Sequence, residues 1–216
     1  MKVNHPLIPI LRSINKFSCP SKSNFHTHTN HSDGSLSPVD LFIQANNNKL
    51  ENIAITDHHS IKAYKEIQNF IDQYNNIDYP TKLWSGIEIT GLLKGVLVHI
   101  LALGFDVDSH YLRPYLKGDS VKGDLLEASN IIQRINKANG LSVLAHPARY
   151  KLIYNQLINE AKKIGFDGVE VWYDYERSHV WRSSPFVCEK ISDLVNRLGM
   201  LSTCGTDTHG LSLMHR

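Results

Sequence analysis

The sequence predicts a single α/β domain, built from alternating strands and helices as a small, irregular barrel. Short apolar runs alternate with amphipathic segments along most of the chain, a pattern typical of parallel βα units in a doubly wound sheet or a barrel. The chain has 216 residues, enough for one domain with a full-sized core. About seven predicted strands in one domain favour the barrel over the open sheet.

Each predicted strand is a short apolar run that ends at Gly, Pro or polar turn residues. We expect strands at residues 24–27, 52–56, 82–90, 96–105, 141–145, 168–173 and 200–204. We expect helices at Pro38–Asn47, 61–74, 125–139, 152–164 and 185–198. Ser37 is placed to cap the first of these, with Pro38 at its first position. Residues 1–22 are predicted to be an N-terminal extension of one or two helical turns, ahead of a domain at 23–216.

Composition excludes several classes of protein. The net charge is only +2, which argues against a dedicated nucleic-acid binder with a basic stripe. The three cysteines, Cys19, Cys188 and Cys204, are widely spaced, which indicates a reducing compartment and no thiolate zinc site. No apolar stretch approaches the roughly 20 residues of a membrane span. We therefore expect a cytoplasmic protein that does not contact membranes.

The twelve histidines are the unusual feature, and several of them follow predicted strands. His26 and His28 are two residues apart on one strand, so both imidazoles point to the same face. Asp57 and His58 are adjacent and point oppositely, so we assign His58 to the site and give Asp57 a supporting role. Other histidines lack a strand-end partner and are expected to be solvated: His5, His31, His110, His179 and His215.

Glu88 and His99 fall on two strands that are predicted to form a hairpin. Glu88 alternates with Ile87 and Ile89, as on a strand with one face on the core and the other on a polar site. A turn centred between Leu93 and Lys94 would place Glu88 directly opposite His99.

Together the strand ends supply nine potential metal ligands: His26, His28, Asp33, His58, Glu88, His99, His146, Asp207 and His209. One ion takes about four to six ligands, so nine suit two or three divalent cations that share a carboxylate. Imidazole and carboxylate without thiolate favour zinc, manganese or iron. Any one of these motifs alone would more often be a surface or packing feature, whereas the whole set at successive strand ends indicates a metal site.

The order of these motifs resembles the polymerase and histidinol phosphatase (PHP) domain family. The resemblance covers about residues 24–212 and rests on six motifs: His-Thr-His-Thr-x-x-Ser-Asp-Gly at 26–34, Ile-Thr-Asp-His at 55–58, Gly-Ile-Glu-Ile at 86–89, Val-His-Ile-Leu at 98–101, Ala-His-Pro at 145–147 and Gly-Thr-Asp-Thr-His at 205–209. It implies a distorted (β/α)7 barrel and up to three metals. It further implies three ligand sets: His26, His28, Glu88 and Asp207; Glu88, His99 and His146; and Asp33, His58 and His209.

The function expected from these residues is hydrolysis of a phosphate ester, with a metal-bridging hydroxide as the nucleophile. The substrate would be a phosphomonoester, a nucleotide or a short oligonucleotide, and no stable nucleic-acid partner is expected. Arg149, three residues after His146, is the candidate for binding the substrate phosphate. Two alternatives remain: a non-catalytic accessory domain that stabilises a partner, and an exonuclease that acts on nucleic-acid ends.

Overall fold

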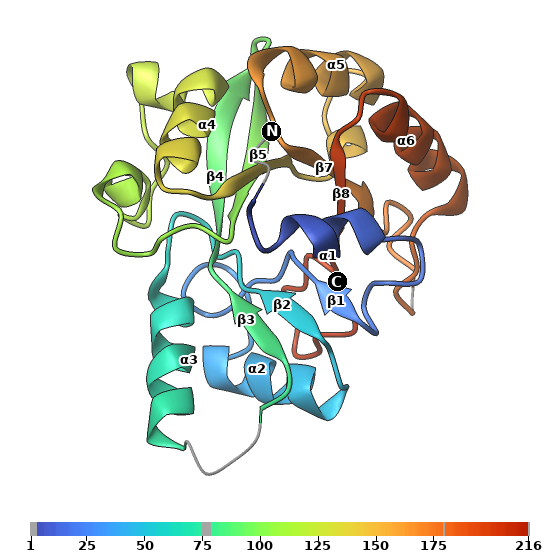
Figure 1. The fold of residues 1–216 in the computed structure, drawn as a ribbon. Helices are drawn as coiled ribbons and strands as arrows, with labels where there is room; N and C mark the ends of the chain where they lie inside the picture. Colours follow the sequence, from blue (N-terminus) through green and yellow to red (C-terminus); the bar gives the residue numbers. More distant parts are fainter. Residues whose placement is uncertain (1–3, 75–78, 179, 216) are drawn as a thin grey trace.

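The strands of the computed structural model, which describes residues 4–74, 79–178 and 180–215, form two sheets (Figure 1). The smaller sheet is parallel, in the order β1 (Ser23–Asn24), β2 (Asn52–Ala54) and β3 (Lys82–Trp84). The larger sheet has five strands, in the order β4 (Gly86–Leu93), β5 (Val96–Leu103), β6 (Leu141–Leu144), β7 (Gly168–Trp172) and β8 (Leu201–Cys204). Within it, β4–β5–β6 are antiparallel neighbours and β6–β7–β8 are parallel.

Helices flank both sheets, as Figure 1 shows. The α-helices are α1 (Ile8–Ser13), α2 (Pro38–Asn47), α3 (Lys62–Gln73), α4 (Ala128–Lys137), α5 (Tyr154–Ile164) and α6 (Pro185–Arg197). Three short 3₁₀ helices lie between them, η1 (His110–Tyr115), η2 (Gly123–Leu126) and η3 (Pro147–Arg149). The N-cap prediction for α2 is confirmed, because Ser37 Oγ accepts a hydrogen bond from the Asp40 N–H at 3.1 Å. No helix among the described residues is long and apolar enough to cross a membrane.

The α/β single-domain prediction is confirmed, and the closed barrel stays a prediction. The strand pairs of the described residues form two open sheets, which meet at isolated bridges between Thr27 and Thr208 and between His58 and Glu88. The strand expected at 82–90 is divided at Ser85, because its first part pairs with β2 and its second part pairs with β5. Ser85 Oγ donates to the Phe105 carbonyl at 2.6 Å at this division.

The register of the β4–β5 hairpin corrects the sequence prediction. The strands are antiparallel, as expected, but Glu88 lies opposite Leu101, and His99 lies opposite Thr90. The turn consists of Lys94 and Gly95, both at positive φ (51° and 76°), which is the conformation that two-residue hairpin turns favour. The register therefore moves by two residues. Because side chains alternate with a period of two, Glu88 and His99 still share one face.

The N-terminal segment packs onto the main core. Leu7 and Leu11 are fully buried, and α1 lies against β8. The prediction that His5 is solvated is wrong, because its ring is buried and its Nε2 lies 2.9 Å from the Gly104 carbonyl oxygen. A side chain at Gly104 would collide with this ring, since an added Cβ would lie 2.6 Å from His5 Cε1.

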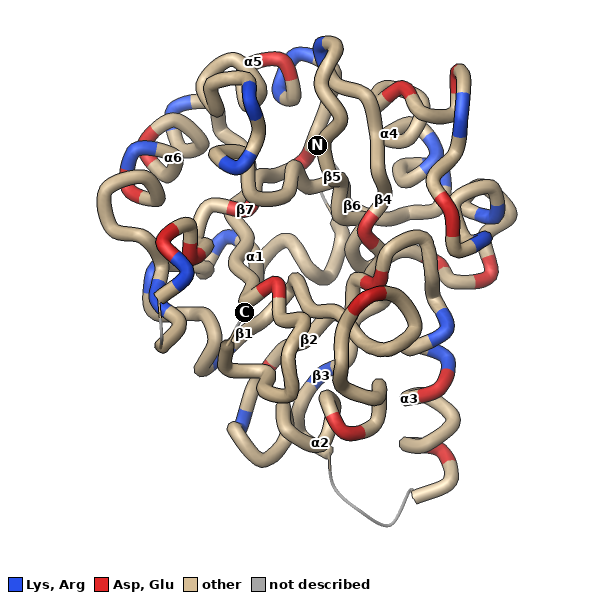
Figure 2. Tube along the Cα trace, turned by 180° about the vertical axis from the view of Figure 1, so that it is seen from behind, with Lys and Arg blue, Asp and Glu red and all other residues tan. Residues whose placement is uncertain are grey.

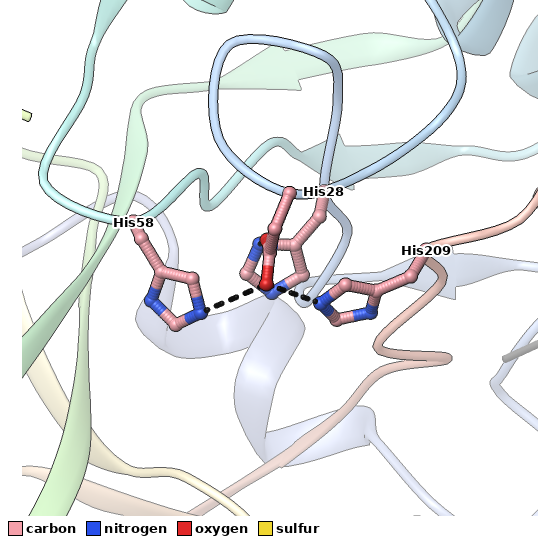
Figure 3. Close-up of side chains that lie close together, drawn as sticks. His28, His58 and His209 are labelled. Atoms are coloured by element: carbon pink, nitrogen blue, oxygen red, sulfur yellow. Dashed lines mark hydrogen bonds and ion pairs between the residues drawn. The ribbon is translucent and has the colours of Figure 1, made fainter.

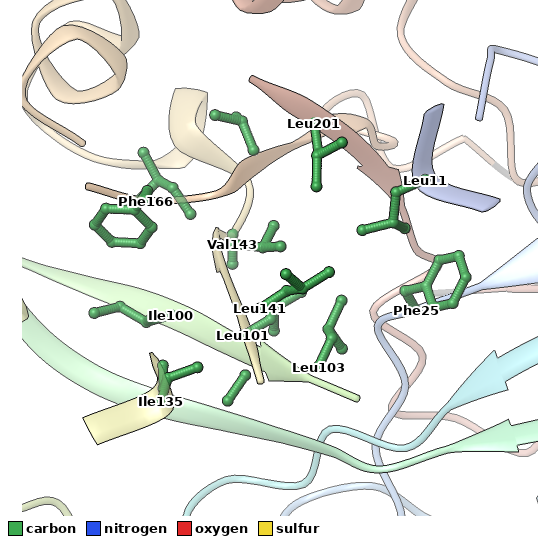
Figure 4. Packing of buried hydrophobic residues seen from close by; sticks show 14 of the residues in the cluster. Leu11, Phe25, Ile100, Leu101, Leu103, Ile135, Leu141, Val143, Phe166 and Leu201 are labelled. Carbon is green, nitrogen blue, oxygen red and sulfur yellow. The ribbon is translucent and has the colours of Figure 1, made fainter. Parts of the chain in front are cut away.

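Two hydrophobic clusters support the two sheets. The larger cluster surrounds the five-stranded sheet, and Figure 4 shows Leu101, Leu103, Val143 and Leu201 packed together there with Leu11 of α1. The smaller cluster joins α2 and α3 to β2, through residues such as Leu41, Phe42, Ile53 and Ile67. The loops at the carboxyl ends of the strands are thus anchored on both sides by packed apolar cores.

Candidate metal centre

All nine residues predicted as metal ligands come together at one end of the strands. They surround a cavity of about 510 Å³, whose lining includes Asp33, His58, Glu88, His99, Asp207 and His209. The remaining three, His26, His28 and His146, are buried. Side chains from both sheets thus converge on one cavity, which is possible because the isolated bridges hold the two sheets together.

The deepest part of the site is a floor group formed by His26, His28, Glu88 and Asp207. Each side chain in this floor group is at most 3% exposed. The Nε2 atoms of His26 and His28 lie 3.2 and 3.1 Å from Glu88 Oε2, and each lies 3.3 Å from Asp207 Oδ1. Two imidazoles and two carboxylates that face one point form a ligand set for a divalent cation.

A second, more open set is the rim group, formed by Asp33, His58 and His209 beside His28. His209 Nε2 and His58 Nε2 lie 3.1 and 3.7 Å from Asp33 Oδ2, and Figure 3 shows the two rings on either side of His28. The Asp33 side chain is 53% exposed. His28 connects the two groups, because its Nδ1 lies 3.5 Å from Asp33 Oδ1 while its Nε2 belongs to the floor.

Glu88 also connects the floor to His99 and His146. Its Oε1 lies 2.9 Å from His99 Nδ1 and 3.4 Å from His146 Nε2. Despite these distances, all three atoms are buried without a hydrogen-bond partner among the described residues. Buried polar atoms that approach closely without bonding one another are the arrangement expected of ligands that face a shared cation. His58, Glu88 and His99 also form a compact group able to hold an ion.

The protonation states of the site follow from burial and from opposite charges. Burial acts to raise the pKa of Glu88, but His26 and His99 hold it well below its usual value. Burial acts to lower the pKa of His28, but hydrogen bonds with Asp207 and Glu88 raise it to about 9. Burial lowers the pKa of His58 to about 4, with its histidine neighbours acting in the same direction. In the metal-free protein at neutral pH, His28 therefore carries a proton and His58 does not.

Glu170 is a site residue that the sequence analysis missed. This buried carboxylate on β7 lies 3.0 Å from His26 Nδ1, and its Oε2 accepts a hydrogen bond from the His146 N–H at 2.8 Å. A signal was present, since Val169-Glu170-Val171 repeats the alternation of Ile87-Glu88-Ile89. An added Cβ at Gly205 would lie 2.8 Å from Glu170 Oε1, so a glycine follows β8 at this point.

Tyr173 and Asp57 hold the ligands in place from outside the floor. Tyr173 OH donates to Asp207 Oδ2 at 2.7 Å, so the other oxygen of Asp207 is left to face His26 and His28. The supporting role expected of Asp57 agrees with the structure, because its carboxylate accepts hydrogen bonds from Thr29 and Ser32 in the loop that carries Asp33. Tyr173 gave no signal in the sequence, because its role depends on a contact across 34 residues.

The remaining histidines have mixed environments. His110 is exposed, as expected, whereas His31 is partly buried and its Nε2 lies 2.7 Å from Glu66 Oε2. His59 is buried, and its Nε2 accepts a hydrogen bond from the Thr90 N–H. His215 is exposed but lines the metal cavity, and His179 lies outside the described residues.

Comparison with known proteins supports the resemblance to the PHP family. Residues 24–99, which include six of the nine expected ligands, match the model of the PHP domain. The resemblance to the PHP family is confirmed. A similar fold is found in a candidate metal-dependent phosphoesterase from Bifidobacterium adolescentis, with a TM-score of 0.68, 21% identity, and coverage of 88% of this chain and 89% of that one. An amidohydrolase from Chromobacterium violaceum, solved with sulfate and no metal, gives a TM-score of 0.71 at 19% identity and 88% coverage of both chains.

A curated relative of this chain is a 5′-3′ exoribonuclease from Haemophilus influenzae, 26% identical over 153 residues. The alignment covers 65% of this chain and 54% of the relative. This chain therefore spans about half the length of the curated relative that it matches.

Proposed function

We propose that this PHP protein is a metal-dependent phosphoesterase that holds two or three divalent cations. The observation that carries this proposal is the convergence of nine imidazole and carboxylate ligands on one cavity, in overlapping groups that share Glu88 and His28. Supporting geometry includes the unbonded buried atoms of Glu88, His99 and His146, which fit the approach of a cation.

Each proposed ion has its own residues. The floor group would hold one ion through His26, His28, Glu88 and Asp207, and the rim group would hold another through Asp33, His58 and His209. A further position would use Glu88, His99 and His146, with His58 close enough to contribute. The donor set favours zinc, manganese or iron. When bound, such ions supply Lewis acidity and lower the pKa of water toward neutrality.

Arg149 would bind the phosphate of the substrate. Its Nη1 donates to Asp207 Oδ2 at 2.9 Å and to Tyr173 OH at 3.1 Å, and the residue lines the metal cavity. These two bonds fix one edge of the guanidinium and orient the rest of the group. Burial acts to lower the pKa of Arg149, but Tyr173 and Asp207 raise it, so the group stays charged. A fixed, charged guanidinium suits the oxygens of a phosphoryl group.

Candidate substrates are phosphomonoesters, nucleotides and short oligonucleotides. A second function, exonuclease action on nucleic-acid ends, is favoured by the similarity to the exoribonuclease from Haemophilus influenzae. Figure 2 shows both acidic and basic residues on α3 and on α6, which suits a short oligonucleotide better than a long duplex track. A non-catalytic accessory role is disfavoured because the whole ligand set is present. The cytoplasmic location stays a prediction.

The test is to measure metal content and phosphoester turnover on the same preparation. We expect two to three ions per chain and turnover of at least one of p-nitrophenyl phosphate, a mononucleotide or a 5′-phosphorylated oligonucleotide with added manganese. EDTA should abolish that turnover. His110→Ala, which changes an exposed histidine outside the cavity lining, serves as the control and should change neither quantity. Less than one ion per chain after manganese or zinc addition, or turnover that survives EDTA, would overturn the proposal.

A further inference from the structure

The loop after β7 contributes to one wall of the metal cavity, and two tyrosines at its start bond to residues around that wall. Tyr173 OH bonds Asp207, and Tyr175 OH accepts a hydrogen bond from the Ala148 N–H at 3.4 Å. The two tyrosine rings pack with their centroids 4.8 Å apart. Arg177, two residues further on, lines the cavity itself. Ser178, the next residue, lines the cavity as well, so this loop presents a cationic and a hydroxyl side chain to it.

Hydrogen bonds brace this loop in one conformation. The buried Asp174 carboxylate accepts from the N–H of Glu176 at 3.1 Å and from the N–H of Ser178 at 2.7 Å. Ser184 Oγ accepts from the Glu176 N–H as well. Arg177 lies between these anchors at a φ of +52°, a left-handed conformation that non-glycine residues seldom adopt. A conformation of this kind persists where surrounding bonds enforce it, and it is often found at binding sites.

The charge of Arg177 is not neutralised by its neighbours. Glu176, the adjacent acid, pairs instead with Arg182, with Arg182 Nη2 at 3.3 Å from its Oε2. Within residues 4–74, 79–178 and 180–215, no ion pair involves Arg177. Arg149 differs, since it is bonded to Asp207. An unpaired guanidinium at a cavity wall is suited to an anion delivered by a ligand.

We infer that Arg177 binds a second anionic group of the substrate, beside the phosphate that is hydrolysed. This inference rests on the proposed phosphoesterase function and narrows its substrate class to molecules with at least two anionic groups. In the reaction, water adds to the phosphorus of one group, the P–O bond to the alcohol breaks, and the alcohol oxygen takes a proton. The second group is unchanged and contributes binding through Arg177.

The experiment compares a 5′-phosphorylated dinucleotide with the same dinucleotide that carries a 5′-hydroxyl. Wild-type protein with manganese should prefer the phosphorylated form in kcat/KM. Arg177→Ala should lower kcat/KM about ten- to a hundredfold for the 5′-phosphorylated dinucleotide, which is the usual effect of losing a charge-assisted contact. It should change kcat/KM little for the 5′-hydroxyl dinucleotide. Arg177→Lys, which keeps the charge, should retain part of the preference. Turnover of p-nitrophenyl phosphate, which has one anionic group, should be unchanged.

Arg197→Ala is the matched control, because this arginine at the end of α6 is exposed and lies outside the metal cavity. It should keep the wild-type preference. The inference is overturned if the wild type shows no preference, or if Arg177→Ala retains it. If no substrate is hydrolysed, the proposed function fails separately, and calorimetric binding of the two dinucleotides to the manganese-loaded proteins then decides the role of Arg177. Equal affinity of wild type and Arg177→Ala for the phosphorylated form would also overturn it.

Discussion

The floor group and the rim group use the same kinds of ligand in different surroundings. In the floor group, His26, His28, Glu88 and Asp207 are almost completely buried, and their charges balance one another within the protein. In the rim group, Asp33 is 53% exposed, and His58 and His209 are 26% and 35% exposed. Water screens the rim charges and can replace a ligand there, whereas the floor atoms are surrounded by other protein atoms.

This contrast indicates that the two positions differ in how tightly they hold an ion. The floor is assembled before the metal binds, since Glu170 fixes His26 and Tyr173 fixes Asp207. The rim depends on a loop that is held at its base by Asp57 while Asp33 itself faces solvent. We expect the floor to retain its ion and the rim to exchange it.

Glu88→Gln should have the largest effect, because Glu88 approaches histidines of every proposed position. The amide removes the negative charge that the metal positions share. The transition state then loses several kcal/mol of metal-assisted stabilisation, so kcat should fall about a thousandfold. Elemental analysis should show at least one ion fewer per chain. Wild-type turnover in Glu88→Gln, with unchanged metal content, would show that the floor and rim do not depend on a common carboxylate.

Glu170→Gln should weaken the floor without removing a proposed ligand. An outer carboxylate that orients a metal-bound histidine is usually worth about ten- to a hundredfold in metal affinity. Competition with a chromophoric chelator measures this affinity, and the nitrogen chemical shift of His26 Nδ1 reports whether it still carries its proton. Rim affinity should change little.

Asp167→Asn is the control for Glu170→Gln, because it also removes a buried carboxylate, directly before β7. Asp167 accepts hydrogen bonds from Ser142 and contacts no ligand of the site. This variant should lose stability but keep the metal affinity of the wild type. Equal loss of affinity in both variants would mean that Glu170 acts only through the fold.

Asp33→Asn should affect the rim alone, with a loss of about tenfold in affinity for one ion. Dilute EDTA should remove metal from the wild type in two phases, a fast phase from the rim and a slow phase from the floor. In Asp33→Asn the fast phase should be faster, or absent because the rim ion is already lost. The exposed Asp108→Asn is the control and should show both phases. A single phase in the wild type would remove the distinction between floor and rim.

The smallest expected effect is a difference between the floor and the rim in the number of protons released when an ion binds. The pKa of His28 is raised to about 9, so an ion that enters the floor at pH 7 must displace a proton. The pKa of His58 is lowered to about 4, so this rim histidine is already neutral. Floor affinity should therefore increase with pH up to about 9, while the His58 contribution stays constant above about pH 5. Calorimetry in buffers of different ionisation enthalpy counts the protons.

The same pKa shifts set the stability of the metal-free protein. Stability from protonated His28 is fully present below its unfolded pKa of about 6.5 and is lost as the pH rises through about 9. Stability from Glu88 and Asp207, whose pKa values are depressed, is present above about pH 4 and is lost in acid. The thermal midpoint of the metal-free protein should therefore fall on both sides of neutral pH. A midpoint that keeps rising from pH 7 to 10 would contradict the protonated state of His28.

The sequence alone determined which side chains share a face of each strand, because the strand-end motifs are local patterns. The i, i+2 spacing of His26 and His28, and the alternation around Glu88, place side chains on one face whatever the rest of the fold does. The helix Pro38–Asn47 was likewise predictable to the residue, because its cap and its first-turn proline are both local signals.

Only the tertiary structure decided the features that depend on distant contacts. The turn at Lys94 and Gly95 set the hairpin register, the choice of partner strand divided residues 82–90 at Ser85, and Gly104 created the space that buries His5. Glu170 and Tyr173 became site residues because β7 lies between β6 and β8, beside the ends that carry His146 and Asp207. Sequence spacing cannot encode these contacts, since each joins segments whose approach depends on the packing of the whole sheet.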